Sequence, residues 1–399
     1  MPDTLIIYEK NNAVISAGFK ERRLTELSIE EKENIYKVGN VFIGHVNKIL
    51  LHLNAAYIDI GMDDNCYMEL SDSFQYLTDR DHPDGELHAG DDLLVQIERE
   101  PAKGKPATVT PKISIAGRLV LAEYCGKNPM LSFSSKIKDG EFKKKLGKSI
   151  IELLPQDMSL LIRTKAYEAD AEEIINDINR VTGSLRSVLE NYRHKKKGSL
   201  VYESAPKYIC SVRDNKEFEY EKLITDQPDI YVRLKDYFQE YSQEKIGTVN
   251  FYSDKVLPLE NLYDMKKNLT EICSEKVWLK SGASIVIQQT EALVSIDINS
   301  SKASAEKKNF KNGFRKLNLE AAEEILRQIK LRSLSGIVII DFINEKNGNR
   351  KELFDEVKQL YKNEKNIQPV DITGLGLMEL TVKRERKPVA DDIKKFRLL

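Results

Sequence analysis

EALVSIDIN (Glu291–Asn299) and GIVIIDF (Gly336–Phe342) are the two stretches that decide the fold of this chain. Both are short apolar runs rich in β-branched residues, a pattern that predicts buried strands. The segment Asn318–Leu334 between them repeats apolar residues at helical spacing, and we expect Asn318 to be the N-cap of that helix. A strand, a helix and a second strand in this order predict an α/β structure for this part of the chain.

Polar side chains fall at the ends of both predicted strands. Because side chains alternate along a strand, Asp297 and Asn299 share one face of the first strand, while Asp341 ends the second. If the strands are neighbours, Asp297 and Asp341 can share a divalent cation, since carboxylate and carbonyl oxygens suit Mg²⁺ or Mn²⁺. On spacing alone, two strand-end aspartates that cap loops or pair with lysine explain the same pattern.

The region 39–115 contains short strand-like segments separated by turn signals, a spacing typical of a small β-barrel. Tyr57 and Tyr67 lie in this region. Aromatic side chains that are exposed on a barrel face can stack on unpaired bases. Packing in the barrel core or at its edge is the alternative interpretation for both tyrosines.

The composition is that of an ordinary soluble chain, and it limits the classes of function. The 399 residues include 62 Lys and Arg against 63 Asp and Glu, and the net charge of -1 excludes a globally basic nucleic-acid binder but not a local basic face. The four cysteines form no CxxC pair, so we expect no cysteine zinc site. Because neither a membrane-length apolar run nor a secretory signal is visible, we expect a cytoplasmic protein without a membrane segment.

Five segments, in order along nearly the whole chain, carry a family resemblance. They are VGNVFIGHVNKILLHLNAAYIDIG (Val38–Gly61), LIRT (Leu161–Thr164), VWLKSGASIVIQQTEALVSIDINSSKA (Val277–Ala303), LNLEAAEEILRQIKLRSLSGIVIIDFI (Leu317–Ile343) and GLGLMELTVKRERKP (Gly374–Pro388). In these segments the chain resembles the ribonuclease E/G family. The first is similar to the start of the family's RNA-binding domain, an OB-fold of the ribosomal S-one type, and the second to its 5′-phosphate sensor. The third and fourth resemble its catalytic strands, and the last its closing segment.

The resemblance implies a multidomain α+β architecture. An RNase H-like subdomain is interrupted by an OB-fold RNA-binding domain and a 5′-sensor domain, and a DNase I-like catalytic subdomain follows. The expected bounds are 1–38 with 208–270 for the RNase H-like subdomain, 39–115 for the OB-fold, 116–207 for the sensor, 271–388 for the catalytic subdomain and 389–399 for a C-terminal tail.

The resemblance also implies a role for individual residues. The implied Mg²⁺ ligands are Asp297 and Asp341, which Asn299 helps to orient; the implied RNA-binding residues are Tyr57, Tyr67 and Lys105; and the implied 5′-phosphate site comprises Gly117, Leu121, Arg163 and Thr164. An arginine can form two parallel bonds to a terminal phosphate, which lysine cannot. From the residues alone, an ordinary surface salt bridge is the alternative role for Arg163.

The implied function is that of an Mg²⁺-dependent endoribonuclease. It would cut single-stranded RNA, leave 5′-phosphate and 3′-hydroxyl ends, and sense a 5′-monophosphate. One rival is a non-catalytic RNA-binding or ribosome-associated protein on the same fold; Asp297, Asn299 and Asp341 argue against it, because binding alone needs no paired carboxylates. Another rival is a metal phosphodiesterase that acts on DNA, since aromatic side chains stack on either type of strand.

The chain departs from the family pattern at several positions. The family often has a CPxC-type zinc link after its closing segment, and none is visible here, so we expect no zinc and a homodimer formed through the catalytic subdomain rather than a zinc-linked tetramer. We also expect no scaffold tail for other degradation enzymes. Asn344 and the SSKA loop (Ser300–Ala303) differ from the family's usual residues and could weaken metal or phosphate binding, and Lys365 and Asn366 stand where an arginine is expected.

Overall fold

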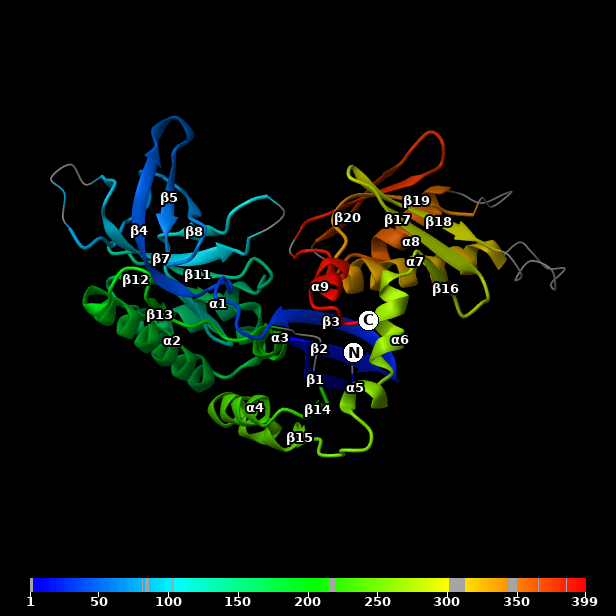
Figure 1. Cartoon of the computed structure of the whole chain (residues 1–399), viewed down its shortest axis with the longest axis horizontal. Coiled ribbons are helices and arrows are strands. Elements are labelled where there is room, and N and C mark those ends of the chain that lie inside the picture. The colour runs from blue at the N-terminus through cyan, green and yellow to red at the C-terminus, as the bar shows by residue number, and fades with distance from the viewer. Residues whose placement is uncertain are drawn as a thin grey trace. The chain divides into compact units, whose positions relative to one another are not determined.

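The computed structural model of the chain has a mixed α/β fold, as the sequence predicts, and describes residues 3–80, 82, 86–101, 104–214, 220–300, 313–343, 350–364, 366–384 and 386–399. The chain divides into two compact units, residues 33–216 and residues 1–32 with 217–399. The first unit is therefore an insertion in the sequence of the second. The described residues form four β-sheets, and each sheet is built within one unit (Figure 1).

The N-terminal sheet combines an antiparallel meander with two strands from much later in the chain. Asn11 and Asn12 both have positive φ, which suits the tight turn between the first two strands because asparagine tolerates this conformation. Its strands, in spatial order, are β15 (Val249–Phe251), β14 (Lys222–Thr225), β1 (Thr4–Lys10), β2 (Ala13–Lys20) and β3 (Arg23–Glu31). The helices of this part are α4 (Pro228–Tyr241), α5 (Leu259–Leu262) and α6 (Met265–Cys273).

The segment 389–399, which the sequence analysis set apart as a tail, is packed into this part of the fold. It contains helix α9 (Val389–Lys395), and Val389, Ile393, Phe396 and Leu398 are buried in the same hydrophobic cluster as residues of β2 and β3. The separation as a tail is therefore wrong. The segment RKPVADDIKKFRLL is rich in charge, but Val389, Ile393 and Phe396 recur at the i, i+4, i+7 spacing of one helical face.

A five-stranded barrel, consistent with an OB-like fold, confirms the barrel predicted in region 39–115. Its strands are β4 (Val41–Leu50), β5 (Ala55–Asp59), β6 (Cys66–Glu69), β8 (Thr108–Thr110) and β7 (Asp92–Arg99), and pairing of β4 with β7 closes the barrel. Strand β13 (Leu200–Tyr202) adds to the free side of β4. Along β5 and β6, buried side chains such as Ile58 and Met68 alternate with half-exposed ones, so each of these strands has one face in the core and one outside.

A four-stranded sheet in the same unit packs against the helix Ala171–Asn191. The strands, in spatial order, are β11 (Leu131–Phe133), β12 (Met158–Ile162), β10 (Val120–Tyr124) and β9 (Ser114–Ala116), and the helices are α1 (Gly140–Ile150), α2 (Ala171–Asn191) and α3 (Lys207–Asp214). Asp170 caps α2 by accepting a 2.8 Å hydrogen bond from the Glu173 amide. The buried residues Ile174, Ile178, Val181, Leu185 and Val188 form the stripe of α2 that faces the core.

The C-terminal sheet contains both strands predicted from EALVSIDIN and GIVIIDF. In spatial order it consists of β16 (Lys276–Trp278), β17 (Ser284–Gln289), β18 (Leu293–Asn299), β19 (Gly336–Asp341), β21 (Met378–Val382) and β20 (Ile367–Ile372). Helices α7 (Gly313–Arg332) and α8 (Arg350–Leu360) share a hydrophobic cluster with one face of the sheet. The alternate side chains of β18 lie on the other face, where Asp297 and Asn299 are exposed.

The described residues also contain short 3₁₀ helices. They are η1 (Leu51–Leu53), η2 (Ile151–Leu153), η3 (Thr164–Glu168), η4 (Tyr192–His194) and η5 (Gln243–Thr248). Among the helices that the structure describes, none combines the length and the apolar character needed to cross a membrane.

Candidate functional site

Asp297 and Asp341 lie directly opposite each other on neighbouring parallel strands. The register pairs Val294 with Val338, Ile296 with Ile340 and Asp297 with Asp341. Paired residues project from the same face of a sheet, and neighbouring strands are about 4.8 Å apart. Both carboxylates are exposed, on the face opposite the buried Ile296 and Ile340. The structure thus brings together the two side chains that the sequence placed on separate strands.

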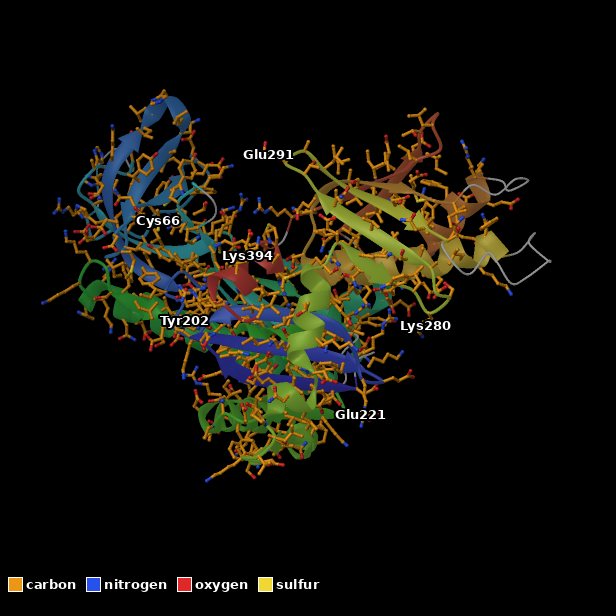
Figure 2. All side chains as sticks on the ribbon, turned by 45° about the vertical axis from the view of Figure 1, so that its right-hand side comes forward. Cys66, Tyr202, Glu221, Lys280, Glu291 and Lys394 are labelled. Carbon is orange, nitrogen blue, oxygen red and sulfur yellow. The ribbon has the colours of Figure 1, made fainter. Side chains whose placement is uncertain are left out.

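Asn299 belongs to the same group. Its side-chain amide donates a 2.8 Å hydrogen bond to Oδ2 of Asp297. This contact holds one oxygen of Asp297 in place and leaves Oδ1 to face other partners. Figure 2 labels Lys280 in the turn before β17 and Glu291 in the turn after it, and Asn299 pairs with Ser284 at the Lys280 end of that strand. The three polar residues therefore lie toward one end of the sheet.

The donor set fits a hard divalent cation. Two carboxylates held side by side repel each other, and a cation between them relieves that repulsion. Mg²⁺ binds through one or two carboxylates and keeps several waters, whereas structural zinc sites use four protein ligands. Within the ranges that the structure describes, no group of three or more His, Cys, Asp and Glu residues could hold a metal. Asp297 and Asp341 therefore form a two-carboxylate arrangement of the kind that suits Mg²⁺ with water or phosphate oxygens.

Asn318 supports the end of β19, and its predicted role as a helix N-cap is wrong. Helix α7 begins at Gly313, so Asn318 lies inside it, fully buried. Its amide nitrogen donates to the Ile343 carbonyl at 2.9 Å, and its Oδ1 accepts from the Ile343 amide at 3.1 Å. The side chain thus fixes the backbone two residues after Asp341. An asparagine can cap a helix or bind a neighbouring loop, and only tertiary contacts decide between the two.

On the barrel, Tyr57 and Tyr67 face each other across β5 and β6. Both rings are half-buried, on the outer side of strands whose other side chains fill the barrel core. Lys48 on β4 pairs with Tyr57, and Thr108 on β8 pairs with Tyr67. One row across four strands therefore presents a cation, two aromatic rings and a hydroxyl. Lys105 is exposed in the segment that leads into β8.

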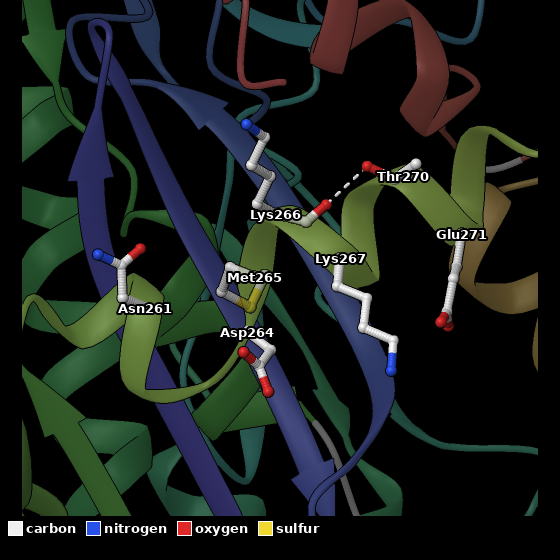
Figure 3. Close-up of a pocket in the computed structure, with 7 residues that line it drawn as sticks. All are labelled: Asn261, Asp264, Met265, Lys266, Lys267, Thr270 and Glu271. Atoms are coloured by element: carbon white, nitrogen blue, oxygen red, sulfur yellow. Dashed lines mark hydrogen bonds between the residues drawn. The ribbon is translucent and has the colours of Figure 1, made fainter.

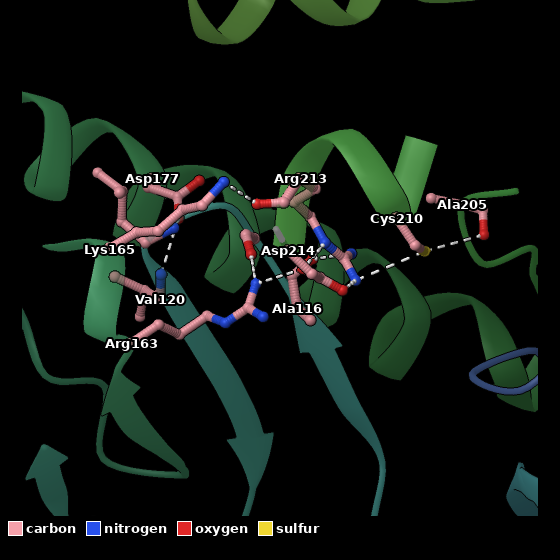
Figure 4. Close-up of polar contacts among 11 residues, drawn as sticks. Ala116, Val120, Arg163, Lys165, Asp177, Ala205, Cys210, Arg213 and Asp214 are labelled. Atoms are coloured by element: carbon pink, nitrogen blue, oxygen red, sulfur yellow. Dashed lines mark hydrogen bonds and ion pairs between the residues drawn. The ribbon is translucent and has the colours of Figure 1, made fainter. Parts of the chain in front are cut away.

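Arg163 lies in a polar cluster next to the four-stranded sheet (Figure 4). Its Nη1 donates to the Gly117 carbonyl at 2.7 Å and forms an ion pair with Oδ1 of Asp214 at 2.9 Å. Arg213 binds the same carboxylate through Nε at 2.7 Å and donates from Nη1 to the Ala116 carbonyl at 2.8 Å. Among the described residues, the side-chain contacts of Arg163 involve Nη1 and neither Nε nor Nη2.

Asp214 is held in its charged form by the two arginines. Burial alone would raise the pKa of the Asp214 carboxyl, but the hydrogen bonds and charges of Arg213 and Arg163 outweigh burial and lower its pKa. An anion therefore already stands beside Arg163. The surface salt bridge that was the alternative role for Arg163 is present in the structure, as the ion pair between Arg163 and Asp214.

The remaining predicted residues of this cluster have structural contacts. The Thr164 hydroxyl lies 2.8 Å from the Ser134 hydroxyl. Leu121 is half-buried on β10, between Ala116 on β9 and Leu161 on β12. Gly117 faces helix α2, and Oδ2 of Asp177 on that helix accepts bonds from the amides of Leu119 and Val120 at 2.7 and 2.9 Å. The turn that carries the Gly117 carbonyl is thus clamped to α2.

A family model described as the Ribonuclease E/G family matches residues 114–385. The chain belongs to this family. It is 27% identical to ribonuclease G of Escherichia coli (strain K12) over 379 residues, which cover 92% of this chain and 76% of that protein. It is 27% identical to ribonuclease E of Haemophilus influenzae over 373 residues, which cover 91% of this chain and 40% of that protein. It is 28% identical to ribonuclease E of Synechocystis over 392 residues, which cover 96% of this chain and 57% of that protein.

Some positions at which this member of the ribonuclease E/G family departs from the expected pattern lie outside the described residues. These are residues 301–303 of the SSKA loop, Asn344 and Lys365. Asn366 is described and lies just before β20, in the unit that does not contain Arg163.

The sequence did not indicate three further side chains of these clusters, those of Arg213, Asp214 and Lys48. The missed residues gave no local signal. Arg213 and Arg163 are 50 positions apart in the chain, and only the packing of α3 joins them. Lys48 follows a register shift between Val46 and Lys48, which breaks the simple alternation along β4. A strict period of two would have placed Lys48 with Val46, inside the barrel.

A surface depression of about 550 Å³ lies on and beside helix α6 (Figure 3). It is lined by Asn261, Asp264, Met265, Lys266, Lys267, Thr270 and Glu271. None of the predicted site residues is among them.

We predict that Gly117→Ala destabilises the protein by about 1–3 kcal/mol. A Cβ at this position would lie 2.5 Å from Oδ2 of Asp177 and 2.7 Å from Cγ1 of Val181, and two amide bonds hold that carboxylate in place. Gly183→Ala on the exposed side of α2 is the matched control. No atom lies within 4 Å of its Cβ, so it should leave stability unchanged or raise it. Equal thermal unfolding midpoints for the two variants would contradict the prediction.

Proposed function

We propose that this chain is an endoribonuclease that cuts single-stranded RNA and depends on Mg²⁺, with Mn²⁺ as a substitute. The observation that carries the proposal is the register of β18 and β19, which aligns Asp297 with Asp341 beside Asn299. Its membership of the ribonuclease E/G family supports the same activity. Paired carboxylates on an exposed sheet face repel each other, a bound cation removes that repulsion, and the binding of RNA alone needs no such pair.

Asp297 and Asp341 are the residues that would hold the metal. When bound, Mg²⁺ polarises a phosphodiester and lowers the pKa of a bound water, so that cleavage leaves a 5′-phosphate and a 3′-hydroxyl. Asn299 keeps Oδ2 of Asp297 in a fixed orientation. Asn318 holds the backbone beyond Asp341, so that this carboxylate stays in register with Asp297.

We assign RNA binding to the row on the barrel. The rings of Tyr57 and Tyr67 offer stacking surfaces, and the neighbouring Lys48 offers a cation for a phosphate. Base stacking does not require a particular sequence, which suits a nuclease that acts on many single strands. Lys105, exposed near β8, would add a second cation.

We assign 5′-monophosphate sensing to Arg163 and its surroundings. The Nε–Nη2 edge of Arg163 has the geometry for two parallel bonds to a terminal phosphate. The Gly117 carbonyl fixes the other side of the guanidinium, and Thr164 adds a hydroxyl. Asp214 opposes this binding, because a bound phosphate would stand near its negative charge.

Each of the four sheets corresponds to one subdomain in this proposal. We propose that the N-terminal sheet is the RNase H-like subdomain, the barrel the OB-fold domain, the four-stranded sheet the sensor, and the C-terminal sheet the DNase I-like catalytic subdomain. A homodimer formed through the catalytic subdomain, the absence of zinc and a cytoplasmic location complete the proposal.

One assay tests the central claim. Matched single-stranded RNA and DNA oligonucleotides, each with a 5′-monophosphate or a 5′-hydroxyl, are incubated with the protein with and without Mg²⁺. We expect internal cuts in RNA only, and only with the metal, at a higher rate for the 5′-monophosphate. Binding without cleavage would instead identify an RNA-binding protein, and equal cleavage of DNA would identify a broader phosphodiesterase.

We predict that Asp297→Asn or Asp341→Asn reduces cleavage to background while RNA binding persists, because each change removes one charge from the metal site. Glu379→Gln, on β21 of the same sheet, is the control and should retain activity. Cleavage rates and binding are measured on folded protein with saturating Mg²⁺. A wild-type rate in either Asp variant would refute the catalytic assignment.

We predict that Tyr57→Ala or Tyr67→Ala weakens binding of single-stranded RNA by about 1–3 kcal/mol through the loss of one stacking surface. Tyr241→Ala on α4 removes a half-buried ring elsewhere and should leave affinity unchanged. Affinity is compared only between variants with equal melting temperatures. Unchanged affinity in a folded Tyr57 variant would reject the stacking role.

We predict that Asp214→Asn raises the preference for 5′-monophosphorylated over 5′-hydroxyl RNA by about two- to fivefold, because a negative charge beside the phosphate is removed. Arg163→Ala should abolish the preference altogether. Asp229→Asn, exposed on α4, is the charge-matched control. The ratio of the two cleavage rates is the measurement, and a lower ratio in Asp214→Asn would mean that this carboxylate supports rather than opposes the phosphate.

A further inference from the structure

Trp278 is the single tryptophan of the chain, and it is largely exposed. It lies on β16, the edge strand of the C-terminal sheet, with 62% of its surface accessible. Large aromatic residues usually bury most of their surface, so a tryptophan left open at a sheet edge calls for an explanation.

The register places Trp278 on the same face as the paired carboxylates. Trp278 pairs with Ser284, and Ser284 pairs with Asn299. In the next row, Lys276 pairs with Val286, which pairs with Asp297, which in turn pairs with Asp341. Two strand spacings, about 10 Å, therefore separate Trp278 from Asn299 and Lys276 from Asp297.

Lys276 and Trp278 form a pair of their own. The Lys276 ammonium lies 4.2 Å from the centroid of the Trp278 ring. A cation at this distance is attracted to the ring face, and the contact orients both side chains. Both residues are exposed, and Lys280 adds a further exposed cation in the turn that follows. This corner of the sheet thus combines an aromatic surface with positive charge.

The surface between Trp278 and Asn299 contains a polar atom without a partner. The Ser284 hydroxyl is buried and forms no hydrogen bond within the part of the chain that the structure describes. A buried hydroxyl without a partner costs free energy, and such groups are rare in folded proteins. Ser284 joins the aromatic corner to the acidic residues along one row of the sheet.

We propose that Trp278 and Lys276 form a nucleotide subsite, in which a base stacks on the indole ring and the adjoining phosphate pairs with the Lys276 ammonium. The subsite would hold the nucleotide next to the phosphodiester that is cut, and it rests on the proposed function. Aromatic stacking with a neighbouring cation is the chemistry that recognises single-stranded nucleic acid. The two lysines favour a polyanion over a second copy of this chain as the occupant.

The single tryptophan makes the test direct, because its emission reports on this one position. A short single-stranded oligoribonucleotide is titrated into the full-length protein with metal chelated, so that the RNA stays intact. We expect saturable quenching of the tryptophan emission. Lys276→Gln should weaken the binding detected in this way, and it should reduce the slope of log affinity against log salt by about 0.7, the value for one phosphate contact on a single strand.

Cleavage by substituted proteins gives an independent readout. Trp278→Leu should raise KM for RNA about 5- to 100-fold while kcat stays within about threefold of wild type, because stacking contributes to binding and not to the chemical step. Trp278→Phe retains a ring and should recover most of the affinity. Phe251→Leu and Lys235→Gln remove an exposed ring and a ring-bound cation from another face and should leave KM unchanged.

Each result has a defined meaning. Emission that changes on dilution of the protein but not on addition of RNA would show that a second copy covers Trp278, and would overturn the proposal. RNA cleavage with neither quenching nor a change of KM in Trp278→Leu would reject the subsite and leave the proposed function intact. Quenching by RNA in a protein that does not cut RNA with Mg²⁺ would support the subsite and reject the proposed function.

Discussion

The parallel pairing of β18 with β19 is the constraint on which the candidate site depends. Parallel strands end on the same edge of a sheet, so two aspartates at the ends of aliphatic runs meet only if the runs pair in this register. The buried Val294 and Ile296 on β18 and Val338 and Ile340 on β19 fix that register, because a slip of one residue in either strand would move the buried pair of that strand to the exposed face. The apolar packing of one face thereby positions the charges of the other.

Helix α7 reinforces this arrangement from the buried side. Asn318 binds the backbone beyond Asp341, and one turn and a half later Glu324 accepts bonds from Arg23 on β3, from Arg327 and from Gln328. The buried carboxylate is thus fully partnered, as its burial requires. Through this contact, the helix that supports the acidic strand end is also anchored to the N-terminal sheet. In the other unit, Asp214 likewise sits between two arginines, Arg163 and Arg213.

The amino-acid sequence was sufficient for those features that repeat within one element. The alternation in SIDIN placed Asp297 and Asn299 on one face, and the strand spacing in region 39–115 predicted the barrel. The roles proposed for Tyr57 and Arg163 came from the resemblance to the ribonuclease E/G family, because no local pattern indicates them. For Asn318 two roles were open, and the sequence favoured the wrong one. An asparagine side chain can cap a helix or bind the backbone of a neighbouring loop, and the local sequence does not distinguish the two.

Tertiary structure decided which distant residues meet. The bulge in β4 brings Lys48 beside Tyr57, α3 brings Arg213 and Asp214 to Arg163, and edge pairing of β16 puts Trp278 in line with Asn299. Each of these contacts depends on the register or the packing between separate elements of the fold. By itself, then, the sequence determined the faces of single strands and helices, since side-chain periodicity is local. The partners across those faces were decided only by the folded chain.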